Sequence, residues 1–206
     1  MTSFVLVPSP LLGPATWEPV ADALVATGHR AVVVPVAQVA AEVAAGDDVV
    51  LVPHSNAGYW APSLGERIVF VDAALPMGGS EETALASPEH LAFLEGLADS
   101  DGVLPPWTQW WDDLGDLFPS AAVRERIEVE QPRLPLSYFA QRVPVPPGWA
   151  SRPCAYLAFG DTYAEEIAFA RAHHWAVTRL DGGHLHQLHD PAGVAAVIVD
   201  LAQVAA

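Results

Sequence analysis

Short apolar runs alternate along the chain with segments whose apolar positions recur every three or four residues. The runs predict buried strands and the recurring patterns predict helices. Strands are expected at residues 4–7, 30–35, 49–52, 68–71, 155–159 and 176–180. Helices are expected at residues 17–27, with Thr16 as the N-cap, and at 36–45, 56–64, 163–173 and 191–205.

This order of elements predicts an α/β fold with a mainly parallel sheet of about six strands. Strands that alternate with helices pair in parallel and carry helices on both faces. The strand runs are apolar throughout, as expected for strands buried on both faces. Ligands of such sheets bind beyond the carboxyl ends of the strands, so the residues just after each strand are the candidates for chemistry.

Residues 76–150 interrupt the alternation. The stretch is too long for a simple crossover between two strands and holds much of the Pro and Trp, including LPPWTQWW at 104–111. Its large apolar residues argue against a disordered insert. We therefore predict an α/β core formed by residues 1–75 and 151–206, with a helical lid inserted between them.

Composition narrows the class of protein. The chain has 206 residues, 51% apolar and 17% charged, which indicates one globular domain with a sizeable core. Its net charge of −16 argues against partners such as nucleic acid or an anionic membrane surface. No apolar run is long enough for a membrane helix and no secretory signal is visible, so a cytoplasmic location is expected. Cys154 is the single cysteine, which excludes an internal disulfide and a cysteine-based zinc site.

Ser55 is the candidate nucleophile. It lies in PHSNAG at residues 53–58, between a predicted strand and a predicted helix. Small residues around a serine at such a tight turn are typical of a nucleophile elbow, which exposes the hydroxyl and leaves the next N–H free to stabilise an oxyanion. The usual glycines are replaced here by Pro53 and Ala57, with Gly58 following. The alternative is that Ser55 merely caps the helix.

His184 is the candidate general base. It follows the last predicted strand in DGGHLHQLHDP at 181–191, and so lies at the same sheet edge as Ser55. A metal site built from His184, His186 and His189 is one alternative, but no helix motif with a carboxylate ligand accompanies them. A set of solvated loop histidines is the other, and we expect it for His186 and His189.

Asp161 is the predicted acid that orients His184. It follows the strand at 155–159, and the chain order Ser55, Asp161, His184 is that of the α/β-hydrolases. Asp72, at the end of the strand at 68–71, is the rival candidate.

These pieces give the chain a resemblance to the compact α/β-hydrolases related to small carboxylesterases and plant hydroxynitrile lyases. The similar segments are residues 5–20, 70–76, 182–184 and 190–191. The resemblance implies that the six strands match the family's last six, and that Asp72 corresponds to a structural aspartate. The family usually has His-Gly after the first of these strands, whereas this chain has PSP at 8–10. Pro10 has no N–H to complete the oxyanion hole, so we expect either that Leu11 donates instead or that the oxyanion hole is weaker.

The sequence thus predicts a serine hydrolase of esterase or thioesterase type that needs no cofactor or metal. It would cleave an ester, thioester or lactone of a mostly apolar small molecule through an acyl-Ser55 intermediate, with the Asn56 N–H as an oxyanion donor. Trp107, Trp110 and Trp111 are expected either to contact the substrate or to form the core of the lid. A lyase or cyclase using the same triad, and a catalytically decayed binding protein, remain the alternatives.

Overall fold

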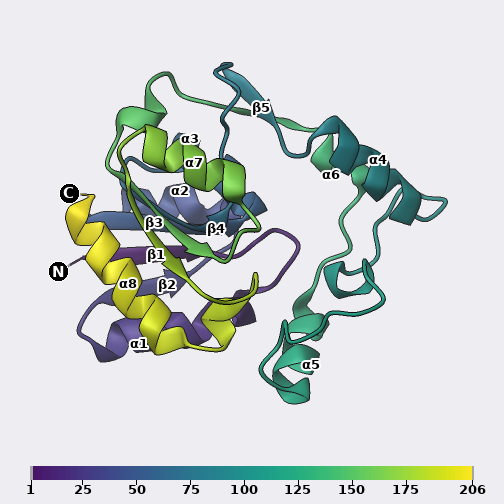
Figure 1. Cartoon of the computed structure of the whole chain (residues 1–206), viewed down its shortest axis with the longest axis horizontal. Coiled ribbons are helices and arrows are strands. Elements are labelled where there is room, and N and C mark those ends of the chain that lie inside the picture. Colours follow the sequence, from purple (N-terminus) through teal and green to yellow (C-terminus); the bar gives the residue numbers. More distant parts are fainter. Residues whose placement is uncertain (1, 206) are drawn as a thin grey trace.

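A computed structural model describes residues 2–205 and has two parts, a layered α/β core and a helical cap beside it (Figure 1). The core contains a six-stranded, entirely parallel sheet in the order β2-β1-β3-β4-β7-β8. Its strands are β1 (Ser3–Val7), β2 (Arg30–Val33), β3 (Val49–Ser55), β4 (Ile68–Ala73), β7 (Cys154–Phe159) and β8 (Ala176–Leu180). All six predicted strands are therefore present, and the predicted fold class is confirmed.

Helices cover both faces of this sheet. The helices α1 (Glu18–Ala26) and α8 (Pro191–Val204) pack against one face. The other face carries α2 (Val39–Ala44), α3 (Ala61–Leu64) and α7 (Ala164–Ala172) (Figure 1). Successive residues of a strand point to opposite faces, so Phe4 and Leu6 pack towards α1 and α8, while Val5 and Val7 pack towards α2. This double burial explains why the strand sequences are continuously apolar.

The ends of several elements differ from the predicted ones. The hydroxyl of Thr16 donates to the Gly13 carbonyl inside a 3-10 turn, and Trp17 is the residue that precedes α1. The predicted helix at 36–45 is divided into η2 (Val36–Gln38) and α2, and the one at 56–64 into η3 (Asn56–Tyr59) and α3. The strands β3 and β4 each extend beyond the apolar run, to Ser55 and Ala73.

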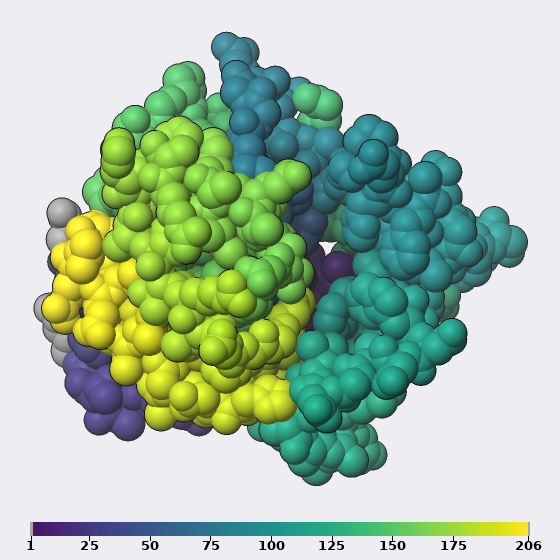
Figure 2. Space-filling model, viewed as in Figure 1, coloured from purple at the N-terminus to yellow at the C-terminus, as the bar shows by residue number. Residues whose placement is uncertain are grey.

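The cap is formed by the chain between β4 and β7. Its helices are α4 (Pro88–Leu97), η4 (Trp107–Gln109), α5 (Ala121–Glu130) and α6 (Leu136–Phe139). Two short antiparallel strands, β5 (Glu82–Ala84) and β6 (Arg142–Pro144), pair where the chain enters and leaves the cap. This small sheet was not predicted, because runs of three residues are too short to show a period. Cap and core meet along a seam, in which the loop after β1 is visible (Figure 2).

The topology places β3 at a switch point of the sheet. The chain passes from β1 to β2 on one side and returns to β3 on the other side of β1. The loops after β1 and β3 therefore diverge, and a crevice opens between them at the carboxyl edge. Ser55 is the last residue of β3 and lies at this crevice. Within residues 2–205, no helix is long and apolar enough to cross a membrane.

Replacement of Gly58 by alanine should destabilise the core. A Cβ atom at Gly58 would lie 2.1 Å from the Ala74 carbonyl oxygen, a clash with backbone that cannot be relieved by a rotamer change. We expect Gly58→Ala to lower the free energy of unfolding by about 1–3 kcal/mol or more in urea denaturation. The matched control is Gly96→Ala in α4, where nothing lies within 4 Å and stability should rise by up to about 1 kcal/mol. Equal stability of Gly58→Ala and the unmodified protein would contradict the close approach.

Candidate active site

Ser55 lies at a strained turn between β3 and η3. Its backbone has φ 57° and ψ −131°, a conformation that non-glycine residues rarely adopt. The Ser55 side chain makes no hydrogen bond that caps η3, so the capping alternative is not the one seen. Backbone strain of this kind is characteristic of functional positions, where the surrounding structure enforces it. The close approach of Gly58 to Ala74 is part of that surrounding structure.

His184 is held by the carboxylate of Asp72. The distance from His184 Nδ1 to Asp72 Oδ2 is 2.6 Å, and the Asp72 side chain is completely buried. The other oxygen, Oδ1, accepts the Phe159 N–H at 2.9 Å. Because an ionised carboxylate only accepts, the proton of the neutral imidazole lies on Nδ1. Nε2 is thereby left unprotonated, in the tautomer that a general base requires.

The prediction that Asp161 holds His184 is wrong. Asp161 is exposed and pairs with Arg179 of β8, at 2.5 Å from Oδ1 to Nη1. It follows Gly160, which adopts a left-handed conformation with φ 71°. The chain order could not separate the two candidates, because Asp72 also lies between Ser55 and His184 in sequence.

A bulge in β4 explains why Asp72 reaches the histidine. His54 pairs with Val71 and Ser55 pairs with Ala73, so Asp72 is an extra residue in the β3–β4 ladder. Its φ is 40°, and such a bulge redirects the side chain. The turn is fixed by the Tyr156 hydroxyl, which donates to the Ala73 carbonyl at 2.6 Å and accepts the Ala73 N–H at 3.0 Å. Sequence periodicity carries no sign of a bulge, which is why this acid was assigned incorrectly.

His54 supports the other side of the His184 loop. Its buried ring stacks on the His184 ring at 4.5 Å, and Nε2 lies 3.0 Å from the His184 carbonyl oxygen. Since a carbonyl only accepts, Nε2 of His54 is the protonated nitrogen. Burial, followed by the nearby His184, lowers the pKa of His54 well below its usual value. A neutral His54 thus positions His184 without adding a charge, a role the sequence analysis did not assign.

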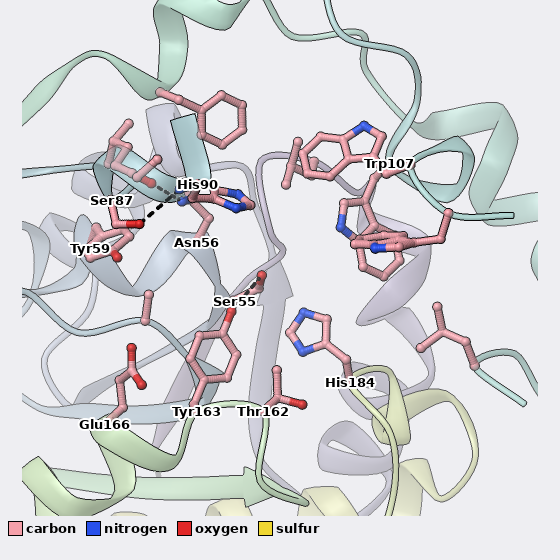
Figure 3. Close-up of a pocket in the computed structure, with 18 of the residues that line it drawn as sticks. Ser55, Asn56, Tyr59, Ser87, His90, Trp107, Thr162, Tyr163, Glu166 and His184 are labelled. Carbon is pink, nitrogen blue, oxygen red and sulfur yellow. Dashed lines mark hydrogen bonds between the residues drawn. The ribbon is translucent and has the colours of Figure 1, made fainter. Parts of the chain in front are cut away.

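Tyr163 faces the serine from the loop before α7. Its hydroxyl lies 3.4 Å from Ser55 Oγ, and its ring centroid lies 5.8 Å from that of His184 (Figure 3). Burial raises the pKa of Tyr163 well above its usual value. The phenol therefore keeps its proton at neutral pH and can donate it in a hydrogen bond. The sequence pattern indicated only that Tyr163 begins a helix. The available signal for a role in the site was its position shortly after the end of a strand.

The two predicted oxyanion donors differ in their surroundings. The Leu11 N–H is directed to Ser9 Oγ at 3.4 Å, next to Pro10, which has no N–H. Asn56 is the first residue of η3, where the backbone N–H has no acceptor within the helix. The Asn56 side chain faces the cap, donating to the Leu85 carbonyl and accepting from the Tyr138 hydroxyl, both at 2.9 Å. The residue after the serine therefore also ties the cap to the core.

One cavity of about 530 Å³ brings most of these groups together. Ser55 and His184 line it, as do both predicted oxyanion residues and the three cap tryptophans predicted to meet the substrate or to pack the lid. Trp110 is buried in the cap core, whereas Trp111 is 44% exposed. Trp107 lies beside the histidine, with its ring 6.0 Å from that of His184 (Figure 3). The tryptophans thus pack against the cap and also border the cavity.

The remaining loop histidines have other contacts. The His189 Nε2 donates to the Leu117 carbonyl at 3.2 Å, and the His186 ring packs edge-on against Phe159. Among residues 2–205, no group of three or more His, Cys, Asp or Glu side chains is arranged to hold a metal ion.

Replacement of Asp72 by asparagine should release His184. In the unmodified protein, the short Nδ1–H hydrogen bond to a buried carboxylate should give a strongly downfield imidazole proton in the NMR spectrum. We expect Asp72→Asn to remove this signal and to lower stability by about 1–3 kcal/mol, because the amide has one acceptor oxygen for the two donors and no negative charge. The matched control Asp161→Asn should keep the signal. Loss of the signal in the control and its retention in Asp72→Asn would restore Asp161 as the partner.

No protein-family model and no curated protein matches the sequence significantly. Solved structures do match. One is an extracellular α/β-hydrolase from a Paenibacillus species, described as sharing structural and functional homology with tobacco salicylic acid binding protein 2. Its identity to this chain is 17% and the TM-score is 0.76, and the alignment covers 98% of this chain and 99% of the other. The pyrethroid hydrolase PytH is also similar, with 16% identity, a TM-score of 0.69 and 98% of each chain covered. Tomato methylketone synthase I has 12% identity and a TM-score of 0.63, with 100% of this chain and 99% of the other covered. Together with the parallel sheet and the turn at Ser55, these likenesses show that the chain has the α/β-hydrolase fold.

Proposed function

We propose that the protein is a serine hydrolase that cleaves an ester, thioester or lactone through an acyl-Ser55 intermediate. The observation that carries the proposal is the hydrogen bond between His184 and the buried Asp72, in the cavity that Ser55 also lines. A serine on a strained turn, a histidine in the correct tautomer and a buried acid are the three parts of a catalytic triad. The hydrolases among the similar structures support this reaction class.

In the proposed reaction, Ser55 Oγ attacks the carbonyl carbon while Nε2 of His184 takes the hydroxyl proton. The tetrahedral intermediate collapses when His184 returns this proton to the leaving alcohol or thiol, which forms the acyl-serine. A water molecule then attacks the acyl carbon, with His184 again as the base, and Ser55 is regenerated. Asp72 stabilises the imidazolium in both halves without taking a proton.

The negative charge on the substrate oxygen needs hydrogen-bond donors. We assign the Asn56 N–H as one donor, because it directly follows the nucleophile. The Leu11 N–H is the second, exchanging its long bond to Ser9 Oγ for the stronger one to an oxyanion. Tyr163 adds a third donor directed at Ser55 Oγ, where it would steady the hydroxyl and the charge that develops as the proton leaves.

The lining of the cavity favours an apolar small substrate. Most of its lining surface is apolar, and Leu11, Leu85, Phe139 and the cap tryptophans contribute to it. We propose that residues 76–150 act as the lid over this substrate, attached at the nucleophile through the two hydrogen bonds of the Asn56 side chain.

A lyase or cyclase that uses the same residues without hydrolysis is the second candidate. Pro10 favours it, because an acyl-transfer site normally needs two backbone donors and proline supplies none. In that reaction His184 and Ser55 would relay a proton and no acyl-enzyme would form. Mass spectrometry of rapidly quenched enzyme with substrate separates the two: an acyl adduct on Ser55 supports the hydrolase.

Ser55 should be the serine labelled by a fluorophosphonate, and Ser55→Ala should abolish labelling. Turnover of a p-nitrophenyl ester should fall by about 10⁴-fold or more in Ser55→Ala and in His184→Ala, and the double mutant should be little worse, because the pair acts as a unit. The control His189→Ala should change turnover little. Full turnover in Ser55→Ala would exclude the acyl-enzyme mechanism.

Replacement of Tyr163 by phenylalanine should lower kcat by about 10-fold with little change in KM, because the hydroxyl acts on the charge developing at Ser55 rather than on bound substrate. Steady-state kinetics with one ester measure both constants. Tyr59→Phe removes a hydroxyl that lines the same cavity, and should reduce kcat less. A kcat for Tyr163→Phe equal to that of the unmodified enzyme would remove Tyr163 from the mechanism.

A further inference from the structure

The cavity beside Ser55 contains acidic side chains and no permanently basic one. The chain has no lysine, and none of its arginines lines this cavity. The carboxylates are those of Asp113 and Glu166. The titratable bases that line the cavity are His184 and His90. Burial lowers the pKa of His90, which favours its neutral form. With a net charge of −16 on the whole chain, the site repels anionic substrates.

Within the part of the chain that the structure describes, Glu166 lies beside Ser55 without a positively charged partner, and its carboxylate accepts a hydrogen bond from its own backbone N–H. It lies in the first turn of α7, half-buried, on the side of Ser55 away from Trp107 (Figure 3). Among the described residues 2–205, no arginine or histidine forms an ion pair with it. Asp113 differs, since it is exposed and its Oδ1 accepts the Gly115 N–H at 2.8 Å. An unpaired, partly desolvated carboxylate costs free energy that a bound cation offsets.

The groups around Glu166 fit the same ligand. Tyr59 and Tyr163 line this end of the cavity with it. Burial and then the charge of Glu166 raise the pKa of Tyr59, and burial, Asp72 and then Glu166 raise the pKa of Tyr163. Burial, and then the carboxylates of Glu165 and Asp72, raise the pKa of Glu166. A carboxylate between aromatic rings is a chemical environment that attracts an ammonium group, through charge and through the ring faces.

We propose that the substrate is an ester or thioester that carries a positively charged amine or ammonium group, and that Glu166 holds this group beside Tyr59 and Tyr163. This inference rests on the proposed hydrolase activity. The scissile carbonyl then lies at Ser55, and an apolar part of the substrate lies against the cap tryptophans. Specificity arises from attraction of the cation and from exclusion of anionic analogues.

The test uses three thiobutyrate esters with the same acyl group. Their leaving thiols are thiocholine, which is cationic, 3,3-dimethylbutanethiol, its uncharged isostere, and 3-mercaptopropionate, which is anionic. Thiol release with a chromogenic reagent gives kcat/KM for each. In Glu166→Gln, the ratio of kcat/KM for the cationic ester to kcat/KM for the neutral ester should fall about 5- to 10-fold. The kcat/KM of the anionic ester should rise relative to that of the neutral ester.

The matched control is Glu165→Gln. Glu165 lies on the same turn of α7, is exposed, and does not line the cavity, yet its replacement changes the net charge equally. In Glu165→Gln, the ratio of kcat/KM for the cationic ester to kcat/KM for the neutral ester should stay within about 2-fold of the value for the unmodified enzyme, because exposed charges are screened. An equal fall in both variants, or an unchanged ratio in Glu166→Gln, overturns the assignment of Glu166 while the hydrolase proposal stands.

A binding measurement keeps the inference testable without turnover. Calorimetry compares choline with 3,3-dimethylbutanol, its uncharged isostere, in the unmodified protein and in Glu166→Gln. Tighter binding of choline that is lost in the variant supports the inference even if no ester is hydrolysed and Ser55 is not labelled, an outcome that defeats the hydrolase proposal alone. Equal binding of the two ligands to the unmodified protein overturns the inference.

Discussion

The buried hydrogen bond between Asp72 and His184 is the interaction on which the site depends. A carboxylate with no solvent exposure is costly unless its oxygens are satisfied. Here one oxygen accepts the Phe159 N–H of the neighbouring strand and the other accepts Nδ1–H of His184. The long loop after β8 is thereby anchored to the centre of the sheet. The same contact sets the tautomer of His184, so one hydrogen bond both anchors the loop and leaves Nε2 of His184 unprotonated.

Two local departures from regular strand geometry make this contact possible. Ser55 and Asp72 lie on adjacent strands, and both have positive φ. The bulge in β4 directs Asp72 towards β7 and the His184 loop, while the turn after β3 places Ser55 in the lining of the cavity. Tyr156 holds the backbone of Ala73 through both its N–H and its carbonyl, and burial raises its pKa well above the usual value, so it stays a neutral phenol. The strain is therefore distributed over paired strands that cannot relax independently.

The cap is coupled to the nucleophile by hydrogen bonds as well as by apolar packing. Asn56 joins Ser55 to the Leu85 carbonyl and to Tyr138, and the Trp60 indole donates to the same Tyr138 hydroxyl at 3.3 Å. Burial raises the pKa of Tyr138 to about 12, so this phenol also remains neutral. A shift of the cap would be transmitted to the residue whose N–H we assign to the oxyanion. The position of the cap and the position of the residue after Ser55 are thus linked.

The sequence by itself determined the layered fold, the six strands and the positions of Ser55 and His184. Continuous apolar runs report burial on both faces, and residues at strand ends must meet at one edge of a parallel sheet. Only the tertiary structure decided which acid serves His184. Asp72 and Asp161 both follow apolar runs and both fit the chain order, but a one-residue bulge buries the first and a salt bridge with Arg179 holds the second at the surface. The contacts of Tyr163 and His54 were also decided there, because they join segments that are distant in sequence, and periodicity records only local burial.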